Sequence, residues 1–342
     1  DQTDVILGYL ESIDDGRKFM DVAARVTRNK PVVIFKSGRT SGGARAASSH
    51  TGSLAGADSA YSAAFRQCGV FRADTIEEFF DYARAFACRK LPANGKVAVV
   101  TNAGGPGIIA TDAIESSRLT MAELSERTRR ALAEHLPPQA AIHNPVDVLG
   151  DAKADRYRLA LEAVARDDGV ASVLTILTPQ TSTEVERTAV AVADAAAATD
   201  KPVLTSFMGS ASVQEAWDIL DRRSVPNFEQ PDRAIGAMEA MLTYSEWRQA
   251  GRTDPPSYEF DEGTIRRVLD EAAANGQGTL GEREARDIAG ACDIALLQSI
   301  FAADEEAAAG AAAEIGYPVA LKVSSGDILH KSDAGGVQVG LP

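Results

Sequence analysis

Short apolar runs alternate with longer amphipathic stretches along most of the chain. The first two runs are residues 5–10 and 31–35, and between them apolar side chains recur at helical spacing over residues 19–26. A strand, a helix and a second strand in this order form a right-handed βαβ unit with parallel strands. The pattern therefore predicts a parallel sheet, with Glu11 and the loop after residue 35 at its carboxyl edge, where open α/β sheets bind ligands.

The alternation begins again at Lys96 and continues to Trp247. Helices at 57–67 and 76–89 are predicted to close the first unit. From Lys96 on, strands are predicted at 96–101, 170–177 and 202–207, and helices at 127–135, 156–166, 184–198, 213–222 and 232–247. Strands that alternate with helices favour doubly wound parallel sheets. We therefore expect an α/β protein with one such domain at 1–93, which is incomplete, and a second at 94–250.

A linker is predicted at 251–261, because this stretch has no periodicity and carries a Pro pair. The last segment, 262–342, is expected to form helices at 265–274, 282–291 and 305–315 and a strand at 318–323. It is too short to bury a core alone. Because the chain also opens without Met, directly before an apolar strand, we expect it to be truncated at both ends.

Composition narrows the class of protein. Of the 342 residues, 45% are hydrophobic and 25% charged, and no apolar run approaches the length of a membrane span. No signal peptide is visible, so a cytoplasmic protein is expected. The three cysteines lie far apart without C-x-x-C spacing, so no metal cluster is predicted in this chain.

The net charge of −14 opposes binding to nucleic acid. The net charge does not exclude the binding of small anions at a local site. An acidic chain poor in Lys is typical of proteins from salt-loving organisms, and this origin is one hypothesis. An acidic bacterial protein of ordinary habitat is the other.

A glycine-rich turn, Asn102-Ala103-Gly104-Gly105-Pro106-Gly107, joins the predicted strand 96–101 to a helix. The first N–H groups of a helix are unpaired and its dipole is positive there, so such a turn favours a bound phosphate. The spacing matches neither a Walker A motif nor a full dinucleotide fingerprint. The turn alone is equally compatible with a plain tight turn.

His50 lies in a second glycine- and hydroxyl-rich loop, Ser48-Ser49-His50-Thr51-Gly52-Ser53-Leu54-Ala55-Gly56. The loop follows a predicted strand and precedes a helix, which is where a reacting group belongs. The residues before it, 36–45, include glycines and two arginines that suit an anion. A lone histidine in such a loop is more often a surface residue, and only its surroundings argue otherwise.

Three signatures in order resemble the nucleoside-diphosphate-forming acyl-CoA synthetases, such as ADP-forming acetate–CoA ligase, which are relatives of succinyl-CoA synthetase. They are Gly38-Arg39 with the His50 loop, the 102–107 turn with Asn144-Pro145-Val146-Asp147, and the 317–323 strand with His330-Lys331-Ser332-Asp333. The resemblance covers essentially the whole chain. It implies two flavodoxin-like CoA-ligase domains followed by the N-terminal part of an ATP-grasp domain.

The resemblance also implies a reaction. Acyl-CoA, ADP and phosphate are exchanged for a carboxylate, CoA and ATP through an acyl phosphate and a phosphohistidine, and a short acid such as acetate is the expected substrate. ATP/ADP, CoA and Mg²⁺ are the implied cofactors, with the metal ligands outside this chain. The implied partners are these small molecules, together with a second copy of the chain or the missing domains, and neither nucleic acid nor a membrane is expected.

The resemblance implies that His50 is the phosphorylated residue and that Glu11 is the carboxylate that orients and stabilises its ring. A neutral imidazole is a competent nucleophile, and a carboxylate on the other ring N–H fixes the tautomer and stabilises the cation that forms. His330 matches a second phosphoryl carrier, and Lys322 a lysine that holds nucleotide phosphates. The expected phosphate-binding residues are Asn102, Gly104, Gly105, Gly107 and Gly52. The expected acyl-substrate contacts are Asn144, Asp147, Thr178 and Gln180, although Asn144 and Asp147 also suit a turn.

Two other functions stay open. In protein acetyltransferases of related build, the scaffold is a non-catalytic module that senses a ligand and lacks the phosphorylated histidine. A CoA-transferring lyase similar to ATP-citrate lyase keeps the histidine but needs a further domain. His50 favours the ligase.

Overall fold

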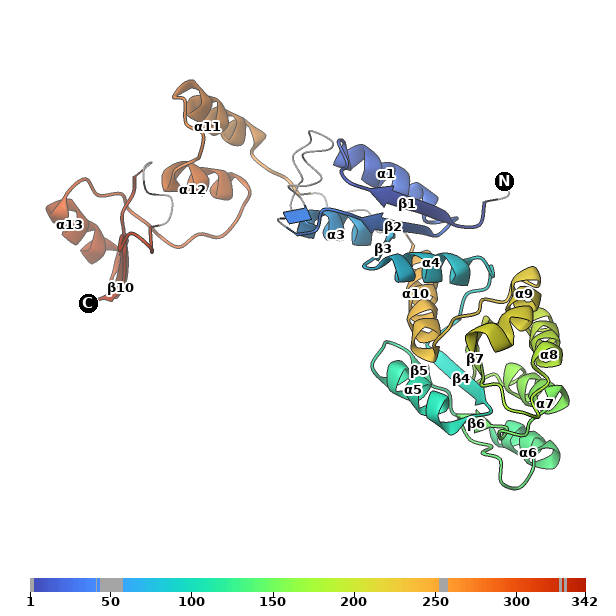
Figure 1. Cartoon of the computed structure of the whole chain (residues 1–342). Coiled ribbons are helices and arrows are strands. Elements are labelled where there is room, and N and C mark those ends of the chain that lie inside the picture. Colours follow the sequence, from blue (N-terminus) through green and yellow to red (C-terminus); the bar gives the residue numbers. More distant parts are fainter. Residues whose placement is uncertain (1–2, 41, 44–57, 252–257, 326–327, 329–330) are drawn as a thin grey trace. The chain divides into compact units, whose positions relative to one another are not determined.

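The computed structural model describes residues 3–40, 42–43, 58–251, 258–325, 328 and 331–342 (Figure 1). The chain forms two compact units, Asp1–Arg252 and Thr253–Pro342. The α/β class and the parallel sheets predicted from the sequence are confirmed.

The first sheet contains strands β1 (Ile6–Leu10), β2 (Val32–Lys36) and β3 (Phe71–Ala73) in that order, all parallel. Helix α1 (Gly16–Val26) joins β1 to β2, as the βαβ pattern predicts. Leu10 lies opposite Lys36 in the register, so the two strands end side by side. Helices α3 (Asp58–Gln67) and α4 (Ile76–Phe86) flank β3 in sequence.

The second sheet has the order β5-β4-β7-β8, and β6 also pairs with β4. Its strands are β4 (Lys96–Thr101), β5 (Thr120–Met121), β6 (Val146–Asp147), β7 (Ser172–Leu177) and β8 (Val203–Phe207), and all its pairs are parallel. Its helices are α5 (Gly104–Glu115), α6 (Glu126–His135), α7 (Ala154–Ala165), α8 (Val185–Ala197), the short η1 (Ser210–Val213), α9 (Gln214–Arg222) and α10 (Pro231–Gln249).

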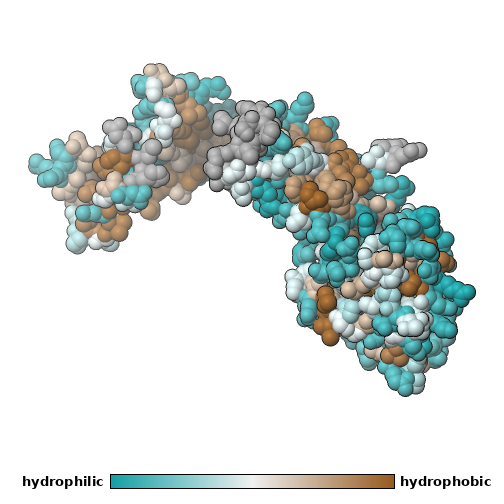
Figure 2. All heavy atoms as spheres, viewed as in Figure 1, coloured by the Kyte–Doolittle hydropathy of each residue, from teal (hydrophilic) through white to brown (hydrophobic). Residues whose placement is uncertain are grey.

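Two apolar layers cover the two faces of this second sheet. One contains Val100 and Val173 with side chains of α6 to α9, and the other contains Val99 and Ile176 with side chains of α5 and α10. The second layer continues to Val33 of β2. The first and second sheets of this unit therefore share one core, in which α10 packs against α4 and α5. The outer surface over α6 to α9 is mainly hydrophilic (Figure 2).

The second unit contains α11 (Glu262–Ala274), α12 (Glu282–Ala291) and α13 (Glu305–Ile315), followed by the antiparallel pair β9 (Val319–Lys322) and β10 (Val337–Leu341). Among its described residues, the buried hydrophobic side chains are Val268 and Ala272. Its core is correspondingly small.

Candidate functional site

The loops after β4, β6, β7 and β8 all leave the carboxyl edge of the second sheet. This edge is where open parallel sheets bind ligands. The predicted residues Asn102, Asp147, Thr178 and Gln180 lie in these loops or at the strand ends. The structure thus places four of the expected contacts along one edge.

Asn102 joins two of these loops. Its side chain is 3% exposed. The Nδ2 group donates to the carbonyl of Thr178 at 2.8 Å, and Oδ1 accepts from the Thr178 N–H at 2.9 Å and from its hydroxyl at 3.1 Å. The amide therefore holds the loop after β4 against the loop after β7. Its role as a phosphate ligand stays a prediction, as does the role of Thr178 in acyl binding.

Helix α5 begins in the glycine-rich turn without a side-chain cap. The N-cap residue is Ala103, and the first turn contains no acidic side chain. Gly104 and Gly105 are exposed, and a Cβ added at either would meet nothing within 4 Å. Pro106 has no N–H, and the N–H of Gly107 donates to the carbonyl of Ala103 at 3.3 Å. The N–H groups of Gly104 and Gly105 have no helical partner, so they form a positive, open end that suits an anion.

Gly107 has a different reason to be glycine. A Cβ there would lie 3.2 Å from Cγ2 of Thr101 and 3.9 Å from Cβ of Pro145. Gly107 is buried and lets α5 pack closely on its own strand. We therefore separate Gly107, which sets packing, from Gly104 and Gly105, which leave space.

Asp147 shapes the turn after β6. Its Oδ1 accepts from the N–H of Leu149 at 2.8 Å, and Leu149 has a positive φ of 72°. Gln180 is exposed, and its side chain lies near Gly150 in the same region. Contact of either residue with an acyl group stays a prediction.

Asn144 is engaged with the backbone of the sheet and precedes a cis peptide bond to Pro145. Its Oδ1 accepts from the N–H of Val99 at 2.9 Å, and its Nδ2 donates to the carbonyls of Val97 at 2.8 Å and Ala122 at 3.0 Å. These atoms lie where β4 stops pairing with β5 and starts pairing with β6. The amide supplies the hydrogen bonds that the β4 ladder lacks at this point. This structural role was not part of the prediction that Asn144 contacts the acyl group.

The carboxyl edge of the first sheet carries the charged groups. Glu11 directly follows β1 and is half-buried, and the N–H of Ser37, after β2, donates to Leu10 at 3.0 Å. The strand ends are thereby tied together beside Glu11. The predicted residues His50 and Gly52 lie outside the described residues.

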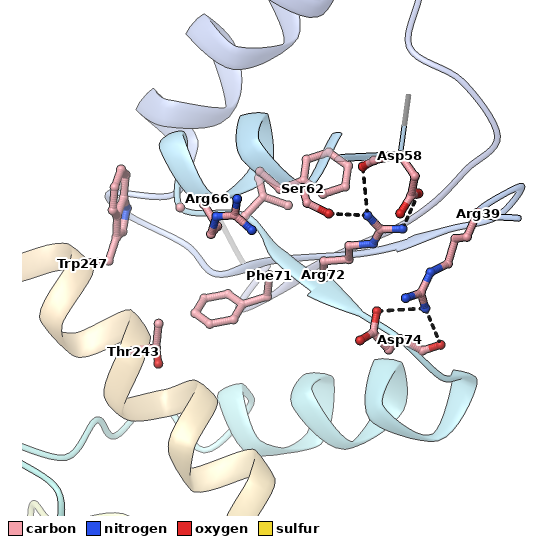
Figure 3. A pocket seen from close by; sticks show the side chains of 12 residues that line it. Arg39, Asp58, Ser62, Arg66, Phe71, Arg72, Asp74, Thr243 and Trp247 are labelled. Carbon is pink, nitrogen blue, oxygen red and sulfur yellow. Dashed lines mark hydrogen bonds and ion pairs between the residues drawn. The ribbon is translucent and has the colours of Figure 1, made fainter. Parts of the chain in front are cut away.

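A cavity of about 450 Å³ lies beside this edge, along β3 (Figure 3). Two ion pairs lie in it: Arg72 contacts Asp58 at 2.6 Å, and Arg39 contacts Asp74 at 2.9 Å. The guanidinium of Arg72 also donates to Ser62 at 2.6 Å. Both guanidinium groups therefore already have a carboxylate partner.

Lys36 is a buried charged residue at this edge that our sequence prediction did not single out. It ends β2 and is 1% exposed. Burial lowers its pKa from the usual lysine value, Asp58 and Glu11 raise it, and Arg72 lowers it. The signal in the sequence is a lysine that directly continues an apolar strand.

In the second unit, one carboxylate gathers two lysines. Oε2 of Glu282 lies 2.7 Å from Nζ of Lys331, and its Oε1 lies 3.9 Å from Nζ of Lys322. The hydrogen bond from Lys331 lowers the pKa of Glu282, and Lys322 adds to the effect. Lys322, the predicted nucleotide lysine, is thus beside Glu282, while His330 lies outside the described residues.

Neither a membrane helix nor a metal cluster is found in the part of the chain that the structure describes. No helix there is long and apolar enough to cross a membrane. No group of three or more His, Cys, Asp or Glu side chains there is placed to hold a metal ion.

Comparison with protein families gives three matches in order. Residues 1–86 match a succinyl-CoA ligase like flavodoxin domain, residues 97–251 a Ligase-CoA domain, and residues 271–342 an ATP-grasp domain.

Two curated relatives align with 99% of this chain. A 4-hydroxybutyrate–CoA ligase (ADP-forming) of Nitrosopumilus maritimus is 37% identical, with 49% of its length covered. An acetate–CoA ligase (ADP-forming) I of Archaeoglobus fulgidus is 40% identical, with 48% covered. The chain spans about half the length of these relatives.

A solved structure is also similar. It is a dinucleotide-forming acetyl-coenzyme A synthetase 1 of Ca. Korarchaeum cryptofilum in complex with phosphate and ADP. The TM-score is 0.69 at 33% sequence identity, over 74% of this chain and 56% of that chain.

Proposed function

Because this chain belongs to the family of ADP-forming acyl-CoA ligases, we propose that it carries out the phosphoryl-transfer part of such a ligase. The overall reaction interconverts acyl-CoA, ADP and phosphate with a carboxylate, CoA and ATP. The observation that carries the proposal is the open, uncapped start of α5 at the carboxyl edge of the second sheet. A phosphate or an acyl phosphate suits this end because the oriented N–H groups bind anions without an added cation.

His50 acts as the phosphoryl carrier in this proposal. The attacking nitrogen of its neutral ring takes the phosphoryl group from the acyl phosphate, and the carboxylate leaves with the electrons of the broken P–O bond. Glu11 accepts a hydrogen bond from the other ring nitrogen and stabilises the charge that forms on the ring. The half-buried position of Glu11 after β1, the strand next to the one that leads into the His50 loop, supports this role.

ADP then receives the phosphoryl group. Lys322 would hold nucleotide phosphates as a point charge, and His330 would relay the group. The ATP-grasp match over 271–342 supports a nucleotide partner. We propose the domain limits 1–93, 94–250 and 262–342, with a linker at 251–261, and the matched ranges support them.

The acyl group is proposed to be short. The two relatives described above are named for acetate and for 4-hydroxybutyrate, so a small unbranched acid is the class that we infer. We also propose that the chain assembles into oligomers.

The test is ATP formation from acetyl-CoA, ADP and phosphate by a protein that contains this chain and has the full length of the relatives. We expect ATP to form, and His50→Ala to abolish it. His135→Ala is the matched control, because His135 is exposed at the end of α6 and its Nδ1 lies 2.8 Å from the carbonyl of Ala131. ATP formation that persists in His50→Ala would overturn the proposal.

The relay is tested separately. His330→Ala should still accept phosphate from acetyl phosphate but pass it poorly to ADP. Unchanged ATP formation by this variant would refute the relay alone.

A further inference from the structure

Lys36 is a buried ammonium group with little direct compensation. Its Nζ donates to the carbonyl of Ser37 at 2.5 Å and lies 4.6 Å from the centre of the Tyr61 ring. With 1% of its surface exposed, it has almost no contact with water. Burying a charge is costly unless it is paired, and a carbonyl and an aromatic face compensate only part of that cost.

The other cations at this edge differ from Lys36. Arg72 and Arg39 each contact a carboxylate, Asp58 at 2.6 Å and Asp74 at 2.9 Å, as Figure 3 shows. Among the described residues, no carboxylate oxygen lies within 4.0 Å of the Lys36 ammonium. Lys36 therefore supplies a buried positive charge at this edge that is not neutralised by direct contact within the described part of the chain.

The position of Lys36 links the elements on which the proposed carrier depends. Leu10 lies opposite Lys36 in the strand register, and Glu11 is the residue that follows Leu10 in the chain. Tyr61, under the ammonium, belongs to α3, the helix that follows the His50 loop in the sequence. Lys36 thus contacts α3 at the end of the strand that leads into that loop.

We propose that Lys36 is a positioning residue for the phosphoryl group at this edge, where its fixed charge offsets the negative charge of that group and of Glu11 without touching the group. This inference rests on the proposed function of His50. A phosphoryl group brings nearly two negative charges, and Glu11 adds another. Attraction across a partly buried region is several times stronger than in water, so one elementary charge there changes an equilibrium by about tenfold or more.

The charge of Lys36 should also set a pH limit. Burial is the main reason that its pKa is lowered, and the groups that face it are Asp58 and Tyr61 of α3, Arg72 of β3 and Glu11 after β1. Because the charged form is lost as pH rises through a lowered pKa, phosphoryl transfer should decline at a lower pH than the usual lysine range.

The first test measures labelling of His50 from acetyl phosphate between pH 7 and 10. We expect Lys36→Met to be labelled about tenfold more slowly at neutral pH. Lys36→Arg should recover most of the rate and lose the alkaline decline, because a guanidinium stays charged. Lys18→Met, which removes an exposed lysine of α1, is the control and should match the wild type.

A folding measurement separates this role from a structural one. Lys36→Met removes a buried charge and keeps the volume, so it should resist urea at least as well as the wild type. Equal labelling of folded Lys36→Met and wild type over the whole pH range would overturn the inference.

A second measurement does not depend on the carrier role of His50. Binding of inorganic phosphate is followed by ³¹P line broadening in Gly105→Asp, where the added carboxylate blocks the start of α5. The phosphate that this variant still binds should be bound about tenfold more weakly after Lys36→Met is added, and equally well after Lys18→Met is added. If the wild type takes no label on His50, the proposed function fails, and this measurement still decides on Lys36. Equal phosphate binding by Gly105→Asp with and without Lys36→Met would then contradict its role.

Discussion

The two carboxyl edges of the first unit are built from different chemistry. At the edge of the second sheet, the groups around the start of α5 are neutral hydrogen-bonding groups: the Asn102 amide, the Thr178 backbone and the open N–H groups of α5. The carboxylate of Asp147 also lies on this edge, where it accepts from a backbone N–H. The edge of the first sheet carries the charges of Glu11, Lys36 and two ion pairs. Oriented N–H groups can receive an anion without changing their own charge, whereas a group that gains and loses a phosphoryl group needs charges nearby. This difference is the basis on which we propose anion reception at one edge and the phosphoryl carrier at the other.

The largest predicted effect comes from placing a negative charge at the start of α5. Gly105→Asp puts a carboxylate into the open space at the start of α5, where it occupies the anion position and repels phosphate. We expect ATP formation to fall about 100-fold or more, as for the loss of a preorganised anion site. Helix stability should not fall, because an acidic group at this end is favourable by ~0.5 kcal/mol.

Gly105→Ala is the matched control for this substitution. A methyl group at this position meets nothing within 4 Å, so the rate should change by less than about threefold. A large loss in Gly105→Ala, or none in Gly105→Asp, would show that the open end of α5 is not where the anion binds.

The next effect concerns stability rather than rate. Asn144→Ala removes three hydrogen bonds to the sheet backbone and leaves buried groups unpaired. We expect the free energy of unfolding to fall by about 2–4 kcal/mol, with little change in the KM for acetyl-CoA of the folded protein. Urea unfolding and initial rates check this. A selective rise in KM without loss of stability would instead support the acyl contact.

The smallest effect lies in the second unit. Glu282 has a lowered pKa, so its contribution to stability is present above the unfolded pKa and is lost as pH falls through the folded pKa. Glu282→Gln should lower the stability of this unit by ~0.5–1 kcal/mol near neutral pH and have no effect in acid. Thermal unfolding of the wild type and of Glu282→Gln, once near neutral pH and once in acid below the folded pKa of Glu282, measures this loss of stability. An equal loss at both pH values would mean that the ion pair with Lys331 is not the cause.

Periodicity predicted most of the fold but missed three short strands of the first unit. Helices α12 and α13 begin and end where the sequence predicts, and the bounds of β4 agree as well. Strands β3, β5 and β6 have three, two and two residues, which is too few for alternation to show. They form because neighbouring strands supply hydrogen-bonding partners, which is a property of the tertiary fold.

The site was predictable where chemistry is local and unpredictable where it depends on packing. The glycine-rich turn of α5 follows from strand, turn and helix signals in one stretch. The roles of Asn102 and Asn144 depend on backbone groups tens of residues away. The ammonium of Lys36 lies against the ring of Tyr61 of α3, so a lysine that continues an apolar strand indicated its position in the sheet but not its burial.

The central claim is that His50 carries the phosphoryl group. The most direct measurement is to incubate the protein with acetyl phosphate, quench it in base and locate the phosphate by mass spectrometry among the four histidines, His50, His135, His143 and His330. The account predicts acid-labile phosphate on His50 that disappears when ADP is added, and none on His135 or His143. Phosphate absent from His50 while ATP is formed would contradict it.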